Sequence, residues 1–166
     1  LAETLTLDLL VTEIIKFSVR RPRPLMHLEP SAIDDEAARD KLREDQGEYD
    51  AHKSFVSGHA SIAFAMATAG GTLWTAKMRE KERTPGRVAA SAAVWAGGMG
   101  LASATAAFRV SAGKHYPTDV LAGAAVGMTV GALVPLAHLR HDAQGPNRVR
   151  WVLLPSPRGA TLSGAF

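Results

Sequence analysis

Apolar residues are concentrated in four long stretches of the chain, with charged residues in the segments between them. In the first stretch, the apolar side chains recur at helical spacing from Leu5 to Ile15. This pattern predicts a helix over Ala2 to Val19, which ends before Pro22 because proline clashes with the preceding helical turn. Three further helices are predicted over Ser57–Met78, Val88–Phe108 and Pro117–Leu139. We therefore expect an all-α helical bundle over residues 1–139.

Two segments outside these helices have little regular pattern. Residues 25–53 are polar and rich in acids, and only Ile33 to Glu44 is compatible with a short surface helix. The C-terminal tail, residues 140–166, contains Gly145-Pro146 and two further prolines, which favour loop. Short strands at Trp151–Leu154 and Ala160–Phe166 are one interpretation of this tail, and a disordered end is the other.

Two of the predicted helices are long enough to cross a lipid bilayer. Val88 to Ala107 and Val120 to Leu139 each contain 20 residues without Asp, Glu, Lys or Arg, and a membrane-spanning helix needs roughly that length. Their Ala, Gly and Ser residues allow the close helix packing of membrane bundles. The pattern favours a membrane-embedded bundle, and helices buried in a soluble bundle are the alternative.

The charges of the connecting segments predict an orientation. If the chain crosses the membrane with each helix, Lys77–Arg87 and Arg140–Arg150 lie on one side, and both carry more bases than acids. The segment from Phe17 to His59 lies on the other side and has more acids than bases. Basic loops of membrane proteins face the cytoplasm. We therefore expect a membrane protein with the segment from Phe17 to His59 outside the cytoplasm, which in a bacterial inner membrane is the periplasmic side. A soluble periplasmic or secreted protein is the alternative.

Composition narrows the possible function classes. A chain of 166 residues with a net charge of +3 fits one domain, and it lacks the runs of like charge that are typical of nucleic-acid binding. The absence of cysteine excludes disulfides and thiolate metal sites, and the carboxylates do not have metal-binding spacing. The oligomeric state is not indicated. Because the chain begins at Leu1, without Met and within a helical pattern, we expect that an N-terminal part of the bundle is missing.

Three segments at helix ends carry candidate chemistry, and the first lies at the end of the first helix. Lys16 belongs to this helix, and Arg23 follows in a turn that Pro22 and Pro24 stiffen. A restricted backbone reduces the entropy lost when a guanidinium holds an anion. Taken alone, this segment favours a simpler interpretation, a basic helix end stabilised by the helix dipole.

The second segment opens the helix predicted from Ser57. Ser57 is a suitable N-cap, and Gly58 lets a ligand approach the backbone closely. The free N–H groups and the positive dipole end favour an anion, and His59 would lie beside it in the first turn. Taken alone, plain helix capping with an incidental histidine explains these residues at least as well.

The third segment lies between the last two predicted helices. Arg109 offers a bidentate donor for phosphate oxygens. His115 and Asp119 are four residues apart, so a helical turn there would bring the carboxylate to one imidazole nitrogen. Such a partner fixes the tautomer, orients the ring and stabilises its cation. A histidine with an orienting carboxylate and basic neighbours is hard to explain as core packing.

Together, the three segments resemble the type 2 phosphatidic acid phosphatase family, which shares its fold with vanadium haloperoxidases and bacterial non-specific acid phosphatases. The family pattern is Lys, six residues, Arg-Pro; then Pro-Ser-Gly-His; then Ser-Arg, five residues, His, three residues, Asp. The residues that match it are Lys16, Arg23, Pro24, Ser57, Gly58, His59, Arg109, His115 and Asp119. Val56 stands where the family usually has proline, and Phe108 stands where it usually has serine. The second difference removes a hydroxyl that would otherwise be available for hydrogen bonding.

The resemblance implies an acid phosphatase/haloperoxidase type of bundle and a role for each matched residue. His115 would attack phosphorus to form a phosphohistidine, Asp119 would orient it, and His59 would protonate the leaving oxygen. The residues implied to hold the phosphate oxygens are Lys16, Arg23, Ser57, Gly58 and Arg109. No metal or other cofactor is expected, and vanadate would act as an inhibitor, or as the cofactor of a haloperoxidase.

A site at the membrane boundary predicts an amphiphilic phosphate ester as the substrate. Phosphatidic acid, phosphatidylglycerol phosphate and an isoprenoid diphosphate all fit, with the polar segment 25–53 beside the site. Three alternatives stay open: a soluble non-specific acid phosphatase, a vanadate-dependent haloperoxidase of the same fold, and a catalytically silent membrane scaffold. The partner expected is therefore a lipid or other small phosphate ester, and not a nucleic acid.

Overall fold

The computed structural model describes residues 1–142, 150–156 and 159–165, and the side chains of residues 1–140. Within these ranges it contains α1 (Ala2–Val19), α2 (Glu36–Gly47), α3 (Gly58–Arg79), α4 (Pro85–Ser111), α5 (Pro117–Asp142), β1 (Arg150–Ser156) and β2 (Gly159–Ala165). Three short 3-10 turns, Pro24–His27, Pro30–Ala32 and Tyr49–His52, connect α1, α2 and α3. The predicted helical bundle is confirmed, and a strand pair follows it.

The helix ends lie where local capping residues place them. α3 begins directly after Ser57, whose hydroxyl oxygen accepts a hydrogen bond from the backbone N–H of Ala60. α4 begins at Pro85, before the Val88 that the apolar pattern predicted. The earlier start has a local cause, because Thr84 caps the helix and proline suits a first helical turn.

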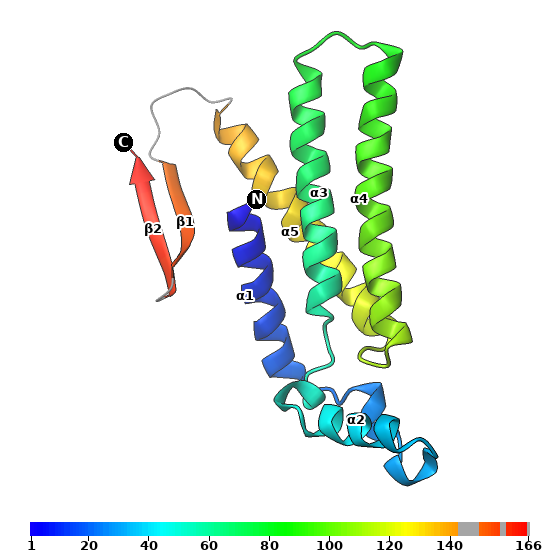
Figure 1. The fold of residues 1–166 in the computed structure, drawn as a ribbon. Coiled ribbons are helices and arrows are strands. Elements are labelled where there is room, and N and C mark those ends of the chain that lie inside the picture. The colour runs from blue at the N-terminus through cyan, green and yellow to red at the C-terminus, as the bar shows by residue number, and fades with distance from the viewer. Residues whose placement is uncertain (143–149, 157–158, 166) are drawn as a thin grey trace.

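α3 lies at the centre of the bundle and contacts α1, α4 and α5. Figure 1 shows α1 and α4 running in the opposite direction to α3 and α5. The C-terminal ends of α1 and α4 and the N-terminal ends of α3 and α5 therefore meet at one end of the bundle, beside α2 (Figure 1). These four ends carry the three segments singled out in the sequence, so the fold brings the segments together.

Close packing between α3 and α5 depends on three glycines of α5 spaced four residues apart: Gly123, Gly127 and Gly131. A Cβ atom on them would overlap the backbone carbonyl oxygens of Ser57, Ser61 and Ala65, respectively. The two helix backbones are thus in direct contact, as small residues permit in tightly packed helix pairs. The contact fixes the start of α5 relative to the start of α3, where the candidate site lies.

The bundle buries several polar side chains of α1 and exposes many large apolar ones. Three side chains of α1 are fully buried: Thr4, Asp8 and Thr12. Asp8 Oδ1 accepts a hydrogen bond of 2.6 Å from Ser61 Oγ of α3, so a carboxyl group lies between two helices. Leu10 and Ile14 of the same helix are exposed instead. Polar residues that face inward and leucines that face outward are typical of helices that contact lipid.

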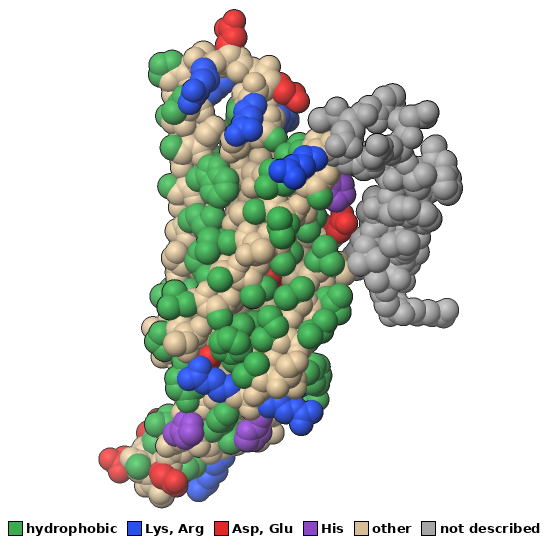
Figure 2. Space-filling model, turned by 180° about the vertical axis from the view of Figure 1, so that it is seen from behind, with side chains coloured by type: hydrophobic (Ala, Val, Ile, Leu, Met, Phe, Trp, Pro, Cys, Tyr) green, Lys and Arg blue, Asp and Glu red, His purple; other side chains and the backbone are tan. Residues whose placement is uncertain are grey.

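Two helices are long and apolar enough to cross a membrane, α4 and the part of α5 over Pro117–Arg140. Only 6% of the apolar window of α4 is buried, so α4 is not a core helix of the part of the chain that the structure describes. Leu101, on its surface, is 74% exposed. Figure 2 shows hydrophobic side chains along the length of the helices, with charged side chains gathered at both ends. This distribution suggests membrane association.

β1 and β2 form an antiparallel pair in which Val152 lies opposite Ser163. The strands predicted at Trp151–Leu154 and Ala160–Phe166 lie within this pair, except for Phe166. Phe166 and residues 143–149, where loop was predicted, lie outside the described residues.

Candidate active site

The first and second segments meet at the start of α3. Lys16 Nζ donates a hydrogen bond of 2.7 Å to Glu13 Oε1 and lies directly over Gly58, since a Cβ added there would be 3.2 Å from the ammonium nitrogen. A glycine at this position therefore lets the lysine charge approach the N-terminus of α3. An anion bound at this helix end would meet both the free N–H groups and the ammonium.

The second and third segments are joined through the backbone. Ser57 is fully buried, and its N–H donates a hydrogen bond of 3.0 Å to the carbonyl oxygen of Asp119. The same residue caps α3, so the starts of α3 and α5 are held against each other by one serine. His59 lies in the first turn of α3 and remains accessible to solvent.

Two arginines carry buried nitrogen atoms that lack a hydrogen-bond partner among the described residues, Arg23 Nε and Arg109 Nε. Arg23 is only 8% exposed, and its backbone N–H is fixed by a hydrogen bond of 2.8 Å to Ala51 O. Leaving a buried donor unpaired is unfavourable, so such groups call for a physical explanation. Two guanidinium groups with an open donor each form a site that an oxyanion would satisfy.

His115 lies in the connection between α4 and α5 and is 4% exposed. Its Nδ1 is 2.8 Å from the backbone carbonyl oxygen of Ser54. Because a carbonyl oxygen only accepts, Nδ1 carries the proton and Nε2 keeps its lone pair. The geometry thus leaves the lone pair of Nε2 available.

The pKa of His115 is lowered to about 4, chiefly by burial and to a smaller extent by the charges of Arg109 and Arg23; the Ser54 hydrogen bond and Asp119 act in the opposite direction. The imidazole is therefore neutral at pH 7. The pKa of His59 is also lowered, first by partial burial and then by Arg109, Lys16 and Arg23. Both histidines consequently lie within the field of the same cations.

Asp119 does not bond to the histidine in the way that the spacing of four residues predicted. Its Oδ2 is 3.9 Å from His115 Nδ1, beyond hydrogen-bond distance. The prediction assumed a helix through both residues, but α5 begins only at Pro117, after His115. Asp119 Oδ2 instead accepts a hydrogen bond of 2.9 Å from the N–H of Tyr116, in the manner of a helix-capping carboxylate. The Ser54 carbonyl, and not Asp119, holds the ring.

Two residues that the sequence did not single out complete this part of the site. Arg21 Nη1 donates to Asp119 Oδ1 at 2.8 Å and to Thr118 Oγ1 at 2.9 Å, and its guanidinium stacks on the Tyr116 ring at 3.9 Å. The Ser54 hydroxyl donates to Asp119 Oδ2. A buried carboxylate such as that of Asp119 needs a cation or several hydrogen-bond donors. This requirement is the signal in the sequence that could have indicated Arg21.

The two departures from the family pattern lie away from these contacts. Val56 is buried at 1% exposure, directly before the α3 cap, and offers no polar group to the site. Phe108 is 71% exposed on the outer surface of α4. A side chain in that direction does not reach the hydrogen bonds around His115, so the missing hydroxyl does not affect them.

An acidic side chain from the end of α2 occupies part of the cation cluster. Glu48 Oε2 accepts a hydrogen bond of 2.9 Å from Arg23 Nη1 and is 3.9 Å from Lys114 Nζ. Lys114 also pairs with Asp45 of α2, which ties the connection between α4 and α5 to this helix. The polar segment therefore lies beside the site and presents a carboxylate to one of its arginines.

Replacing this carboxylate is expected to strengthen anion binding. In Glu48→Gln, Arg23 loses a competing negative charge, so inorganic phosphate should bind about 3- to 10-fold more tightly, the range of a single exposed ion pair or slightly more. Isothermal titration of phosphate into the parent protein and the variant measures this change. Asp40→Asn, on the exposed face of α2, serves as the control. Unchanged or weaker phosphate binding in Glu48→Gln would contradict the competition.

The described residues contain no group of three or more His, Asp and Glu side chains placed to hold a metal ion. No curated protein and no solved structure matches the sequence significantly. A family model does match, that of the PAP2 superfamily, over residues 1–142. This match covers α1 to α5 and every site residue described above, and the chain therefore belongs to the PAP2 superfamily.

Proposed function

We propose that this protein is a membrane-embedded phosphatase that hydrolyses a lipid phosphate or diphosphate ester through a phosphohistidine. Phosphatase-type hydrolysis is the activity of the superfamily, and the finer assignment rests on one observation. His115 is buried and neutral, its Nδ1 proton is committed to the Ser54 carbonyl, and its Nε2 lone pair remains free. A neutral imidazole beside two arginines with open donors is suited to attack an anionic phosphorus centre.

The first chemical step forms a bond between His115 Nε2 and phosphorus and breaks the bond between phosphorus and the leaving oxygen. His59 gives its proton to that oxygen, so the leaving group departs with a protonated oxygen. The leaving group is an alcohol for a phosphate ester and a monophosphate ester for a diphosphate. In the second step, water attacks the phosphohistidine, His59 takes a proton from the water, and the N–P bond breaks. Inorganic phosphate leaves, and both histidines return to their starting states.

The charged groups of the site support both steps. Lys16, Arg23 and Arg109 would hold the non-bridging oxygens, whose charge must be stabilised as the phosphoryl group moves. Phosphorylation of Nε2 leaves a positive imidazole with its proton on Nδ1. The Ser54 carbonyl at 2.8 Å and the Asp119 carboxylate at 3.9 Å stabilise this cation. Asp119 thus acts through its charge as well as through the residues it positions.

The membrane setting is supported by the apolar exterior of the bundle and by two helices of spanning length. The basic connection between α3 and α4 lies at the end of the bundle opposite α2, which fits a cytoplasmic position for it. In a bacterial inner membrane, the site would then open toward the periplasm at the lipid boundary. Phosphatidic acid, phosphatidylglycerol phosphate and an isoprenoid diphosphate would present their phosphate groups at that depth.

Hydrolysis of a panel of esters by the detergent-solubilised protein tests this proposal. The panel contains these three lipids and a soluble ester such as 4-nitrophenyl phosphate, and phosphate release is measured. We expect release from at least one lipid with a kcat/KM at least tenfold above that of the soluble ester. Preference for the soluble ester by a protein that extracts without detergent would indicate a soluble acid phosphatase. Halide oxidation with added vanadate would indicate a haloperoxidase, and no turnover of any substrate would leave only a scaffold.

The pKa shifts predict an acidic optimum for kcat/KM. His115 must be neutral to attack, and its pKa of about 4 makes the rate fall below that pH. His59 must be protonated to act as an acid, and its pKa lies below the ordinary 6.5, so the rate also falls as the pH rises toward neutrality. A pH profile of kcat/KM should therefore be bell-shaped, with its maximum between about 4 and 6.5. His59→Asn should lose the alkaline limb, and a profile that rises through pH 8 would contradict these assignments.

A further inference from the structure

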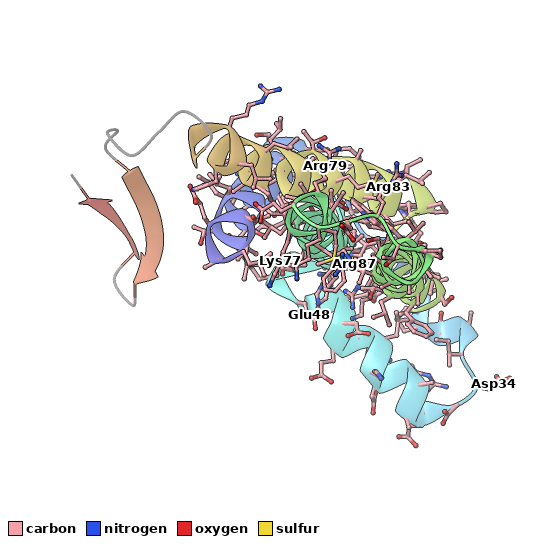
Figure 3. All side chains as sticks on the ribbon, turned by 90° about the horizontal axis from the view of Figure 1, so that it is seen from above. Asp34, Glu48, Lys77, Arg79, Arg83 and Arg87 are labelled. Atoms are coloured by element: carbon pink, nitrogen blue, oxygen red, sulfur yellow. The ribbon has the colours of Figure 1, made fainter. Side chains whose placement is uncertain are left out.

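The end of the bundle opposite the active site carries a second concentration of positive charge. The connection between α3 and α4 and the adjoining helix turns contribute five basic residues: Lys77, Arg79, Lys81, Arg83 and Arg87. Only Glu80 and Glu82 oppose them in the same stretch. Figure 3 shows Lys77, Arg79, Arg83 and Arg87 around the ends of α3 and α4.

Four of these side chains surround a cavity of about 450 Å³: Arg79, Lys81, Arg83 and Arg87. Glu82 is the one acidic residue that lines it, and Met78 and Val88 contribute apolar surface. A cavity of this volume lies within the range of small-ligand sites, about 300–1,000 Å³. A lining that combines basic and apolar side chains fits a ligand with an anionic group joined to an apolar part.

The basic side chains of this cavity are free of acidic partners within the described structure. None of the four forms an ion pair with a described residue, although Glu80 and Glu82 are close in the sequence. At the active-site end, by contrast, Arg21, Arg23 and Lys114 each pair with a carboxylate. The cavity therefore carries uncompensated positive charge.

Hydrogen bonds hold the walls of the cavity in place. Arg87 Nη1 donates to Glu82 O at 2.8 Å, which folds the connection back onto α4. Trp74 Nε1 of α3 donates to Ser91 Oγ of α4 at 3.1 Å, and Ser91 lines the cavity. Trp95 Nε1 of α4 donates to Thr75 Oγ1 of α3 at 3.0 Å, and Thr75 also lines it.

The two tryptophans are a second indication that the cavity lies at the boundary between lipid and water. Both link α3 to α4 close to the basic end, and each donates its one N–H group to the other helix. Tryptophan is enriched at the boundary between lipid and water. Basic pockets between membrane helices at such a boundary bind the head groups of anionic lipids.

We propose that this cavity binds the phosphate of an anionic phospholipid from the membrane leaflet opposite the active site. The proposal rests on the membrane setting proposed above, but it does not depend on the hydrolytic activity. The phosphate and head group contact the arginines and Lys81, and the acyl chains lie along the apolar surfaces of α3 and α4. The lipid is a bound ligand here and not the substrate, because the reactive His115 lies at the other end of the bundle.

The tryptophans provide a direct test of this site. The protein in a Trp151→Phe background, which leaves Trp74 and Trp95 as its tryptophans, is placed in vesicles of mixed phosphatidylglycerol and phosphatidylcholine. One of the two lipids carries brominated acyl chains, which quench nearby indoles, and the fluorescence is measured against the mole fraction of that lipid. We expect half-maximal quenching at an at least threefold lower mole fraction of brominated phosphatidylglycerol than of brominated phosphatidylcholine.

A pair of charge variants separates the cavity from general electrostatics. Arg79→Gln with Arg83→Gln should reduce the phosphatidylglycerol preference to less than about half of the parent value. Lys77→Gln with Arg140→Gln removes the same charge from exposed positions at the same end of the bundle that do not line the cavity, and should leave the preference close to the parent value. Equal quenching by both lipids, or a preference that both variant pairs alter equally, would overturn the proposal. Inorganic phosphate distinguishes a lipid ligand from a soluble one. If millimolar phosphate abolishes the preference and chloride of equal ionic strength does not, the cavity binds a soluble phosphate and the lipid proposal is overturned.

Discussion

Replacing His115 by alanine is expected to abolish turnover, with kcat reduced by roughly four to six orders of magnitude, as for loss of a covalent nucleophile elsewhere. The buried, neutral imidazole is held in place by the hydrogen bond from Nδ1 to Ser54 O, and its Nε2 keeps a lone pair for the attack on phosphorus. Phosphate should still bind in the variant, because the donors of Lys16, Arg23 and Arg109 remain. Phosphate release from the preferred ester and titration of inorganic phosphate measure the two effects separately.

A labelled substrate makes the test specific for the covalent intermediate. With a radiolabelled phosphoryl group, rapid denaturation at alkaline pH should retain label on the parent protein and none on His115→Ala, since phosphohistidine survives base. His27→Ala, at an exposed position outside the site, is the matched control and should keep both label and turnover. Turnover that persists in His115→Ala, free of contaminating phosphatase, would exclude this nucleophile.

Much of the helical architecture follows from local sequence. The breaks at Pro22 and Pro117 and the cap at Ser57 are decided by residues next to one another, so α1, α3 and α5 are found at the predicted positions. Capping also explains the one early helix start, since Thr84 and Pro85 act before the apolar pattern begins. Such features depend on the neighbouring residues and not on the rest of the fold.

The direction in which the helices face is less accessible to sequence reasoning. The leucines of α1 locate the helix, but hydrophobicity alone does not distinguish a protein core from lipid. The fully buried Asp8 and the exposed Ile14 show that the polar face of α1 points inward. A polar stripe at helical spacing in an otherwise apolar helix is the pattern that could have indicated this orientation.

The candidate site also contains residues that local sequence indicates and residues that only the packed fold brings together. The cations and both histidines are predicted from motifs within single segments, because each motif lies at one helix end. The partners of Asp119 come from two other segments, Arg21 before α2 and Ser54 before α3, and only the packed bundle brings them together. Their sequence separation of more than 60 residues left no local signal of the contact.

Replacing Asp119 by asparagine is expected to lower kcat by about 100- to 10,000-fold and to change the phosphate affinity by less than about threefold. The range follows the loss seen when the carboxylate behind a catalytic histidine becomes an amide. Both oxygens of Asp119 accept hydrogen bonds, from Arg21 on one side and from Tyr116 N–H and Ser54 Oγ on the other. An amide accepts on one side only, so its NH₂ group must face one of these donors. The positive imidazole that forms on phosphorylation also loses its nearest negative charge.

The pH profile separates the electrostatic role of Asp119 from a structural one. Asp119 raises the pKa of His115 against the effect of burial, so removing its charge should move the acid limb of kcat/KM to still lower pH. A defect in packing alone would lower the rate and leave that limb in place. Ser54→Ala is the matched comparison, because it removes the hydroxyl that Asp119 accepts and keeps the backbone carbonyl that holds His115. Its kcat should fall about tenfold or less, the effect of one buried hydrogen bond. If Ser54→Ala proved as damaging as Asp119→Asn, and the acid limb stayed fixed in both, then Asp119 would act only by holding the serine, and the charge on the carboxylate would have no part in the reaction.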